Sequence, residues 1–399
     1  MKHNIYFDNA ATTKVDPAVL SAMLPYFSDE YGNASSLHYA GLNNRVVVDR
    51  SQAKIADFLG CDKSEVYFTS GATESDNMAI LGVTEAINNG SNKAKRHVIT
   101  TKIEHDAILE PCRELEKMGV KVTYLTPNQD GLVTAEKVKA AIEPETVLVS
   151  IMYVNNEIGT ILPIGEIGRM ITQLNSQREN KIYFHTDATQ ALNFLDCNVE
   201  ALKVDLLSLS GHKIYGPKGI GAIYIRRGTP FKPITFGGHQ QAGVRPGTYN
   251  VPAVAGLAEA VNSLSDKKTI DQQNDKIKEL RDYIIKQVLL RITGSIVTGT
   301  KEERSPNNAS FVFEGVKGED IVLSLSEKGL AVSTGSACSS GSLDPSHVLL
   351  ALGLKPELAH GSLRVSLSKY NTENEAKVFV EELEETVSQL RKIMNPTPL

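Results

Sequence analysis

The stretch "IYFHTDATQALNFLDCNVEALKVDLLSLSGHK" (residues 182–213) contains two short apolar runs, "IYFHT" and "VDLLSLS". Runs this short and this apolar are typical of strands that are buried on both faces. Such strands occur in parallel sheets that are covered by helices. Each run ends in polar residues, Asp187 after the first and Gly211-His212-Lys213 after the second. The stretch therefore predicts a parallel sheet with functional polar residues gathered at one edge.

The same alternation continues on both sides of this stretch. Strand-like runs "EVYFTS", "HVITT", "VKVTYLT", "TVLVSIM" and "GAIYIR" are separated by helical segments over 72–87, 106–118, 134–142 and 165–178. This order predicts an α/β fold whose large domain has a mostly parallel central sheet. Residues 252–293 look largely helical. Strand-like "NASFVF" and "SLRVSLS" then alternate with helices near 318–328 and 372–393. We predict a large domain over 15–260 and a smaller C-terminal α/β domain over 261–399. Residues 1–14 are assigned to the smaller domain, although they could pack on either.

Composition narrows the class of protein. The 399 residues are 41% hydrophobic and 22% charged, with a formal net charge of -5 and no long block of one sign. This balance argues against nucleic acid or an anionic membrane as the main partner. No run reaches the roughly 18 apolar residues of a membrane span, and the N-terminus lacks a secretory apolar segment. The four cysteines form no CxxC, so we expect no disulfide framework or zinc site, and a cytoplasmic location.

Polar residues follow the predicted strands at the edge where parallel sheets bind ligands. They are Ser70-Gly71-Ala72-Thr73-Glu74-Ser75, Glu104-His105, Asn155-Asn156-Glu157, Asp187 and Gly211-His212-Lys213. Taken singly, these residues are more simply explained as an N-cap, polar turns and a solvated lysine. Together they supply an anion cradle, an imidazole, an acid and a lysine, which is the set that pyridoxal 5'-phosphate requires. No dinucleotide or P-loop motif is present.

A separate small-residue loop, "STGSACSSGS" (333–342), carries Cys338. Serine, threonine and glycine cannot bury a thiol, so this cysteine is predicted to be exposed and mobile. The alternative is a plain surface loop with an incidental cysteine. Cys61, Cys112 and Cys197 lie in more ordered apolar surroundings, which usually make a cysteine an inert core residue.

The chain resembles a known family in several segments. "YFDNAATT" (6–13), "TSGATESDN" (69–77), "EHDA" (104–107), "NNEIG" (155–159), "HTDATQ" (185–190), "SGHKIYGPKGIGA" (210–222), "RPGT" (245–248), "STGSACSS" (333–340) and "LRVSLSKYNTE" (363–373) are similar to the cysteine desulfurases. These NifS/IscS-like enzymes belong to the class V aminotransferase superfamily. The match covers essentially the whole chain in the family's order. It implies a fold-type I homodimer that binds pyridoxal 5'-phosphate.

The resemblance also implies roles for individual residues. Lys213 would carry the cofactor covalently, Asp187 would pair with its ring nitrogen, and His105 would stack on the ring and is a candidate proton acceptor. The phosphate would be held by Ala72, Thr73, Ser210, His212 and, from the other subunit, Thr248. The oxygen side of the ring would be held by Asn156 and Gln190. Asn156 and Arg364 would bind the substrate carboxylate, for which a planar guanidinium is suited, although Arg364 could equally be a salt-bridged strand residue.

The implied reaction converts L-cysteine to L-alanine. Cys338 would attack the substrate sulfur and hold it as a persulfide for an acceptor protein in iron–sulfur cluster assembly or thiolation. No resident metal is expected, although Cys338 could share an iron–sulfur ligand role with a scaffold protein. Three other interpretations remain open from the sequence: a pyridoxal-phosphate aminotransferase or lyase without need of Cys338, a selenocysteine lyase, and an inactive scaffold.

Overall fold

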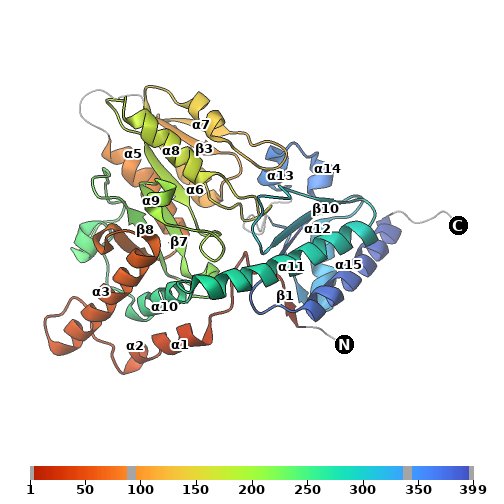
Figure 1. Ribbon diagram of the computed structural model, residues 1–399, viewed down its shortest axis with the longest axis horizontal. Coiled ribbons are helices and arrows are strands. Elements are labelled where there is room, and N and C mark those ends of the chain that lie inside the picture. The colour runs from red at the N-terminus through yellow and green to blue at the C-terminus, as the bar shows by residue number, and fades with distance from the viewer. Residues whose placement is uncertain (1–3, 88–95, 336–343, 395–399) are drawn as a thin grey trace.

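The computed structural model describes residues 4–87, 96–335 and 344–394 (Figure 1). Its larger part is built on a sheet that has, among the described residues, seven strands in the order β2-β8-β7-β6-β5-β3-β4. The strands are β2 (Val66–Thr69), β3 (His97–Thr101), β4 (Lys121–Leu125), β5 (Thr146–Ser150), β6 (Tyr183–Asp187), β7 (Leu206–Ser210) and β8 (Gly221–Ile225). Strands β3 to β7 are parallel, whereas β8 is antiparallel to β7 and β2. The predicted mostly parallel sheet is confirmed.

Both faces of this sheet are buried, which explains the unbroken apolar runs. Along β5, Leu148 joins one core cluster and its neighbour Val149 joins the other. The period of two that places successive side chains on opposite faces accounts for this split. The covering helices are α3 (Tyr39–Leu59), α4 (Ala72–Asn77), α5 (Val83–Ala86), α6 (Asp106–Lys117), α7 (Ala135–Ala141), α8 (Ile164–Asn175), α9 (Val199–Leu202) and α10 (Val251–Asn262).

A smaller part contains the antiparallel sheet β12-β10-β9 (Figure 1). Its elements are β9 (Ser295–Val297), β10 (Asn308–Phe313), β12 (Ser362–Ser366), α11 (Lys267–Arg291), α12 (Gly318–Glu327), α13 (His347–Ala351), α14 (Pro356–Ala359) and α15 (Glu373–Met394). The N-terminal segment belongs to the same core, because Ile5 and Phe7 cluster with residues of α11, β10 and α15. Strand β1 (Ile5–Tyr6) pairs in parallel with β11 (Leu330–Ala331). The domain limits at 14 and 260 stay a prediction.

Local geometry departs from the sequence expectation at two places. The helix expected over 72–87 is interrupted by a π-helical turn, η2 (Met78–Gly82), between α4 and α5. The helices α1 (Pro17–Met23), α2 (Pro25–Ser28) and α3 were not predicted. Within the ranges that the structure describes, no helix is both long and apolar enough to cross a membrane.

Candidate active site

A cavity of about 640 Å³ lies where the predicted site residues meet. Its lining includes, of the residues predicted to bind cofactor or substrate, Ala72, Thr73, His105, Asn156, Asp187, Gln190, Ser210, His212, Lys213 and Arg364. Thr248 is exposed and does not line it. Cys338 lies outside the described residues, but Gly335, three positions before it, does line the cavity. Residues at the strand ends of the larger part and Arg364 of β12 in the smaller part thus line the same cavity.

One wall of the cavity is the start of α4. Gly71 precedes the helix with a φ of 153°, and no side chain caps it. Gly221 on β8 permits this close turn, since a Cβ there would stand 2.8 Å from the Cα of Gly71. Free N–H groups at such a helix start favour an anion. His212 is on the same lining, and burial, with the nearby lysine charges, lowers its pKa to about 4. His212 is therefore a neutral hydrogen-bonding group at neutral pH.

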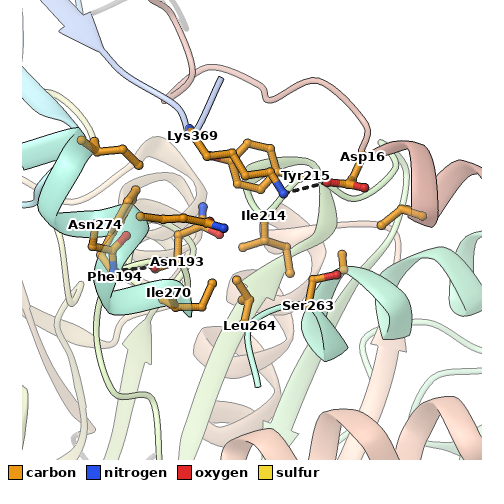
Figure 2. Close-up of a pocket in the computed structure, with 14 residues that line it drawn as sticks. Asp16, Asn193, Phe194, Ile214, Tyr215, Ser263, Leu264, Ile270, Asn274 and Lys369 are labelled. Atoms are coloured by element: carbon orange, nitrogen blue, oxygen red, sulfur yellow. Dashed lines mark hydrogen bonds and ion pairs between the residues drawn. The ribbon is translucent and has the colours of Figure 1, made fainter. Parts of the chain in front are cut away.

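Lys213 stands in the short helical turn η3 (Gly211–Lys213), directly after β7. Its ammonium donates to the backbone carbonyls of Ala10 and Ala11, the second at 2.8 Å. The backbone of Lys213 is also held, because Asn193 Nδ2 donates a hydrogen bond to the Lys213 carbonyl at 2.7 Å. Asn274 of α11 in turn donates to the carbonyl of Asn193 at 3.1 Å, and both line a second cavity of about 150 Å³ (Figure 2). The lysine is thus anchored on two sides.

Asp187 ends strand β6 and is 8% exposed. Its Oδ1 accepts the N–H of Thr189 at 2.8 Å, whereas Oδ2 has no hydrogen-bond donor among the described residues. Two buried acids lie near Asp187, and one of them, Asp76, lines the cavity. Burial raises the pKa of Asp76 well above its usual range and raises that of Glu104 to about 8. Glu104 therefore keeps most of its proton at neutral pH, and burial disfavours the charged form of Asp76 as well.

His105 caps the N-terminus of α6 with its own ring. Its Nδ1 accepts the N–H of Ala107 at 3.1 Å, which places the proton of a neutral ring on Nε2. In this arrangement the imidazole can donate a hydrogen bond from its Nε2–H group. Proton uptake requires Nδ1 to give up the cap, so the predicted role of His105 as a proton acceptor involves breaking this contact.

Arg364 lies in β12 and is 3% exposed, which is rare for arginine without partners. Its Nη1 donates to the carbonyl of Asn156 at 3.0 Å, and its Nη2 donates to Asp8 Oδ1 at 2.7 Å. Asn155 shapes the turn that presents this carbonyl, because its Oδ1 accepts the N–H groups of Glu157 and Ile158. Sequence reasoning missed Asp8, although it stands inside "YFDNAATT".

The other described cysteines are poor nucleophiles. Cys61, Cys112 and Cys197 are free, and burial raises the pKa of each thiol, to about 12 for Cys61 and Cys112. A thiol with such a pKa is almost wholly protonated at neutral pH. Within the described ranges, no group of three or more histidine, cysteine, aspartate or glutamate residues is placed to hold a metal ion.

These observations agree with the donor set that pyridoxal 5'-phosphate needs. An uncapped helix start suits its phosphate, and an open carboxylate oxygen suits its ring nitrogen. A lysine amine at the end of β7 suits its aldehyde. The residues present therefore fit the group.

Comparisons with known proteins agree with this geometry. Residues 5–379 match the aminotransferase class-V family. The cysteine desulfurase IscS of Dictyoglomus turgidum is 45% identical over 98% of this chain and 97% of its own. A solved NifS-like protein has a TM-score of 0.89 at 36% identity, covering 97% of this chain and all of that one. SspA in complex with cysteine has a TM-score of 0.79 at 37% identity, covering 93% of this chain and all of that one. The chain belongs to the class-V aminotransferase family and, within it, to the cysteine desulfurases.

Proposed function

We propose that this protein converts L-cysteine to L-alanine and passes the sulfur, held as a persulfide on Cys338, to acceptor proteins. The observation that carries the proposal is the convergence in one cavity of Lys213, Asp187, the uncapped start of α4 and the buried Arg364. An aminotransferase acting on an α-amino acid would share all four features, so they alone do not identify the substrate. The solved complex of the similar SspA with cysteine supports cysteine as the substrate here.

Pyridoxal 5'-phosphate is the proposed cofactor. Lys213 would bind it covalently, Asp187 Oδ2 would pair with the ring nitrogen, and His105 would stack on the ring. Asn156 and Gln190 would hold the oxygen side of the ring. The phosphate would be held by Ala72, Thr73, Ser210, His212 and the partner subunit's Thr248. When bound, the cofactor supplies an electron sink that weakens the C–S bond of an attached amino acid.

The chain's own residues orient the substrate and move protons. Arg364 and Asn156 would fix the α-carboxylate, which sets the side-chain sulfur at one place in the cavity. His105 would accept a proton once its Nδ1 gives up the helix cap, and with the cap intact its Nε2–H would donate a hydrogen bond into the cavity. Burial disfavours the charged forms of Asp76 and Glu104, which would leave Asp187 as the partner of the ring nitrogen.

Sulfur transfer is assigned to Cys338. Its thiolate would attack the substrate sulfur, forming an S–S bond as the substrate's C–S bond breaks. L-cysteine and a Cys338 thiol thus become L-alanine and a Cys338 persulfide, with every atom retained. Cys338 lies outside the described residues, and support for it comes from the sequence of its loop and from the raised pKa of the other three thiols.

The proposed assembly is a homodimer. The N-terminal helices and the loop between α2 and α3 carry large apolar side chains that are exposed in the single chain, and Leu37 in that loop is 91% exposed. The apolar patch consists of Leu20, Leu24, Phe27, Tyr31, Leu37, Tyr39, Leu42 and Val46. Patches of this kind mark protein interfaces. A partner covering it would agree with Thr248 acting across subunits, because Thr248 does not line the cavity of its own chain.

We also infer a cytoplasmic location and an acceptor in iron–sulfur cluster assembly or thiolation. The free thiols of Cys61, Cys112 and Cys197 suit a reducing compartment. The similarity to proteins named IscS supports the iron–sulfur role.

One experiment tests the whole proposal. The purified protein with pyridoxal phosphate is given L-cysteine and a thiol acceptor, and alanine and transferred sulfur are counted together. Equal amounts of the two, with the added sulfur found by mass spectrometry on the peptide that contains Cys338, are expected. Pyruvate in place of alanine, or sulfur on another cysteine, would contradict the proposal.

A further inference from the structure

The guanidinium of Arg364 is held on two sides before any substrate arrives. A guanidinium has five N–H donors. One N–H of Nη1 is used by Asn156 and one of Nη2 by Asp8. The Nε atom is buried and has no partner among the described residues. One N–H therefore remains on each terminal nitrogen, and Arg364 lines the cavity.

Asp8 is fixed more firmly than a surface ion-pair partner. It forms a parallel bridge to Ser366 at the end of β12, and its backbone carbonyl accepts the N–H of Ala11 at 3.0 Å. Next to it, Asn9 donates through Nδ2 to the carbonyl of Ser366 at 2.8 Å. The carboxylate that meets Arg364 thus has little freedom to follow the arginine if the arginine moves.

We propose that Asp8 is a positioning residue, which fixes the plane of the Arg364 guanidinium so that its open edge meets the substrate carboxylate. The inference rests on the proposed role of Arg364. Bidentate recognition of a carboxylate depends on this plane, because both N–H groups must point at both oxygens at once. The opposing explanation is that Asp8 only neutralises a buried charge, which any nearby carboxylate could do.

Binding of L-alanine to the holoenzyme separates the two explanations. Alanine has the substrate's carboxylate without its sulfur, and L-alaninamide lacks the negative charge. Calorimetry on Asp8→Ala should show alanine binding weaker by on the order of tenfold, with alaninamide binding unchanged. Asp8→Asn keeps an oxygen acceptor at the same place and should bind alanine within about threefold of the wild type. Asp8→Glu displaces the guanidinium and should resemble Asp8→Ala.

The reverse ranking, with Asp8→Glu close to the wild type and Asp8→Asn as weak as Asp8→Ala, would overturn the proposal in favour of charge neutralisation. If Asp8→Ala does not fold, as judged by circular dichroism, the ranking of the other two variants still decides. Asp16→Ala is the matched control, because Asp16 also joins the N-terminal segment to the smaller part, through Lys369 at 2.7 Å (Figure 2). It should leave the ratio of alanine to alaninamide binding unchanged.

Arg364→Ala distinguishes failure of this inference from failure of the proposed function. A loss specific to alanine in Arg364→Ala, without one in Asp8→Ala, would overturn the role of Asp8 alone. No alanine-specific loss in Arg364→Ala would overturn the carboxylate role of Arg364, and the role of Asp8 with it.

Discussion

Replacing Glu104 by glutamine should change how the stability of this protein depends on pH. Glu104 is 1% exposed and lies three residues after the end of β3. It accepts hydrogen bonds from Thr101 Oγ1 at 2.7 Å and from the N–H of Met152 at 3.1 Å. Burial outweighs these bonds and raises its pKa from 4.5 to about 8. The folded protein therefore keeps a proton that the unfolded chain has released.

The sign of the effect follows from this difference in proton binding. Between pH 4.5 and 8 the unfolded state binds fewer protons at this residue, so the free energy of unfolding falls as pH rises. Each pH unit is worth about 1.4 kcal/mol, which makes a loss of about 3 kcal/mol between pH 5 and pH 7 for the wild type. Glutamine does not titrate, so the Glu104→Gln protein does not lose this part of its free energy of unfolding as pH rises. It adds one further buried N–H donor, which lowers stability by about 1–3 kcal/mol at every pH.

Urea unfolding at pH 5, 6 and 7, followed by circular dichroism, measures the effect. Glu104→Gln should be less stable than the wild type at pH 5 and should close that gap, or reverse it, by pH 7. Other titrating groups are common to both proteins and cancel in the difference. Glu110→Gln, on the exposed side of α6, is the control and should run parallel to the wild type. Parallel curves for Glu104→Gln as well would refute the claim that Glu104 stays protonated beside the cavity.

Three further changes test the proposed site and assembly. Lys213→Ala should fold, yet lose the lysine adduct that borohydride traps after incubation with pyridoxal phosphate; an unchanged trapped adduct by mass spectrometry would contradict the assignment. Cys338→Ser should still bind the cofactor, judged by absorbance, and fail to transfer sulfur, whereas serine at the other three cysteines should leave turnover within a few-fold. Leu37→Asp should shift the mass measured by light scattering from dimer to monomer, because it places a charge in the apolar patch; an unchanged dimer would argue against that interface.

The larger sheet could be predicted because its strands leave a clear signal. Both faces are buried, so each strand is apolar at consecutive positions, as Leu148 and Val149 show in β5. Parallel topology then places the polar residues after each strand at one edge, which is why Asp187 and Lys213 were found together. The π-helical turn at Met78–Gly82 had no such signal, since an extra residue in a helical turn changes no periodicity over so short a segment.

The roles of the N-terminal segment could not be predicted from the sequence. Asp8 is 356 positions from Arg364, and no spacing rule connects them. Ala10 and Ala11 act through backbone carbonyls, so their side chains give no hint that they hold Lys213. The family-like segment "YFDNAATT" was noticed, but its residues were given no role. Thr248 and Cys338 stay predictions, because the first is expected to act in another subunit and the second lies outside the described residues.

The position of this segment bears on how the two halves of the site stay in register. Ile5 and Phe7 are part of the smaller part's core, and Asp8 pairs with Arg364 in β12. Only a few residues later, the Ala10 and Ala11 carbonyls hold the ammonium of Lys213 in the larger part. A peptide this short can span only a few ångströms for each residue. The separation between the arginine and the lysine is therefore limited by the segment 8–11 itself, as well as by packing between the two parts. Insertion of a residue between Asp8 and Ala10 should weaken both carboxylate binding and cofactor attachment. Substitutions elsewhere between the larger and the smaller part should leave at least one of these two properties unchanged.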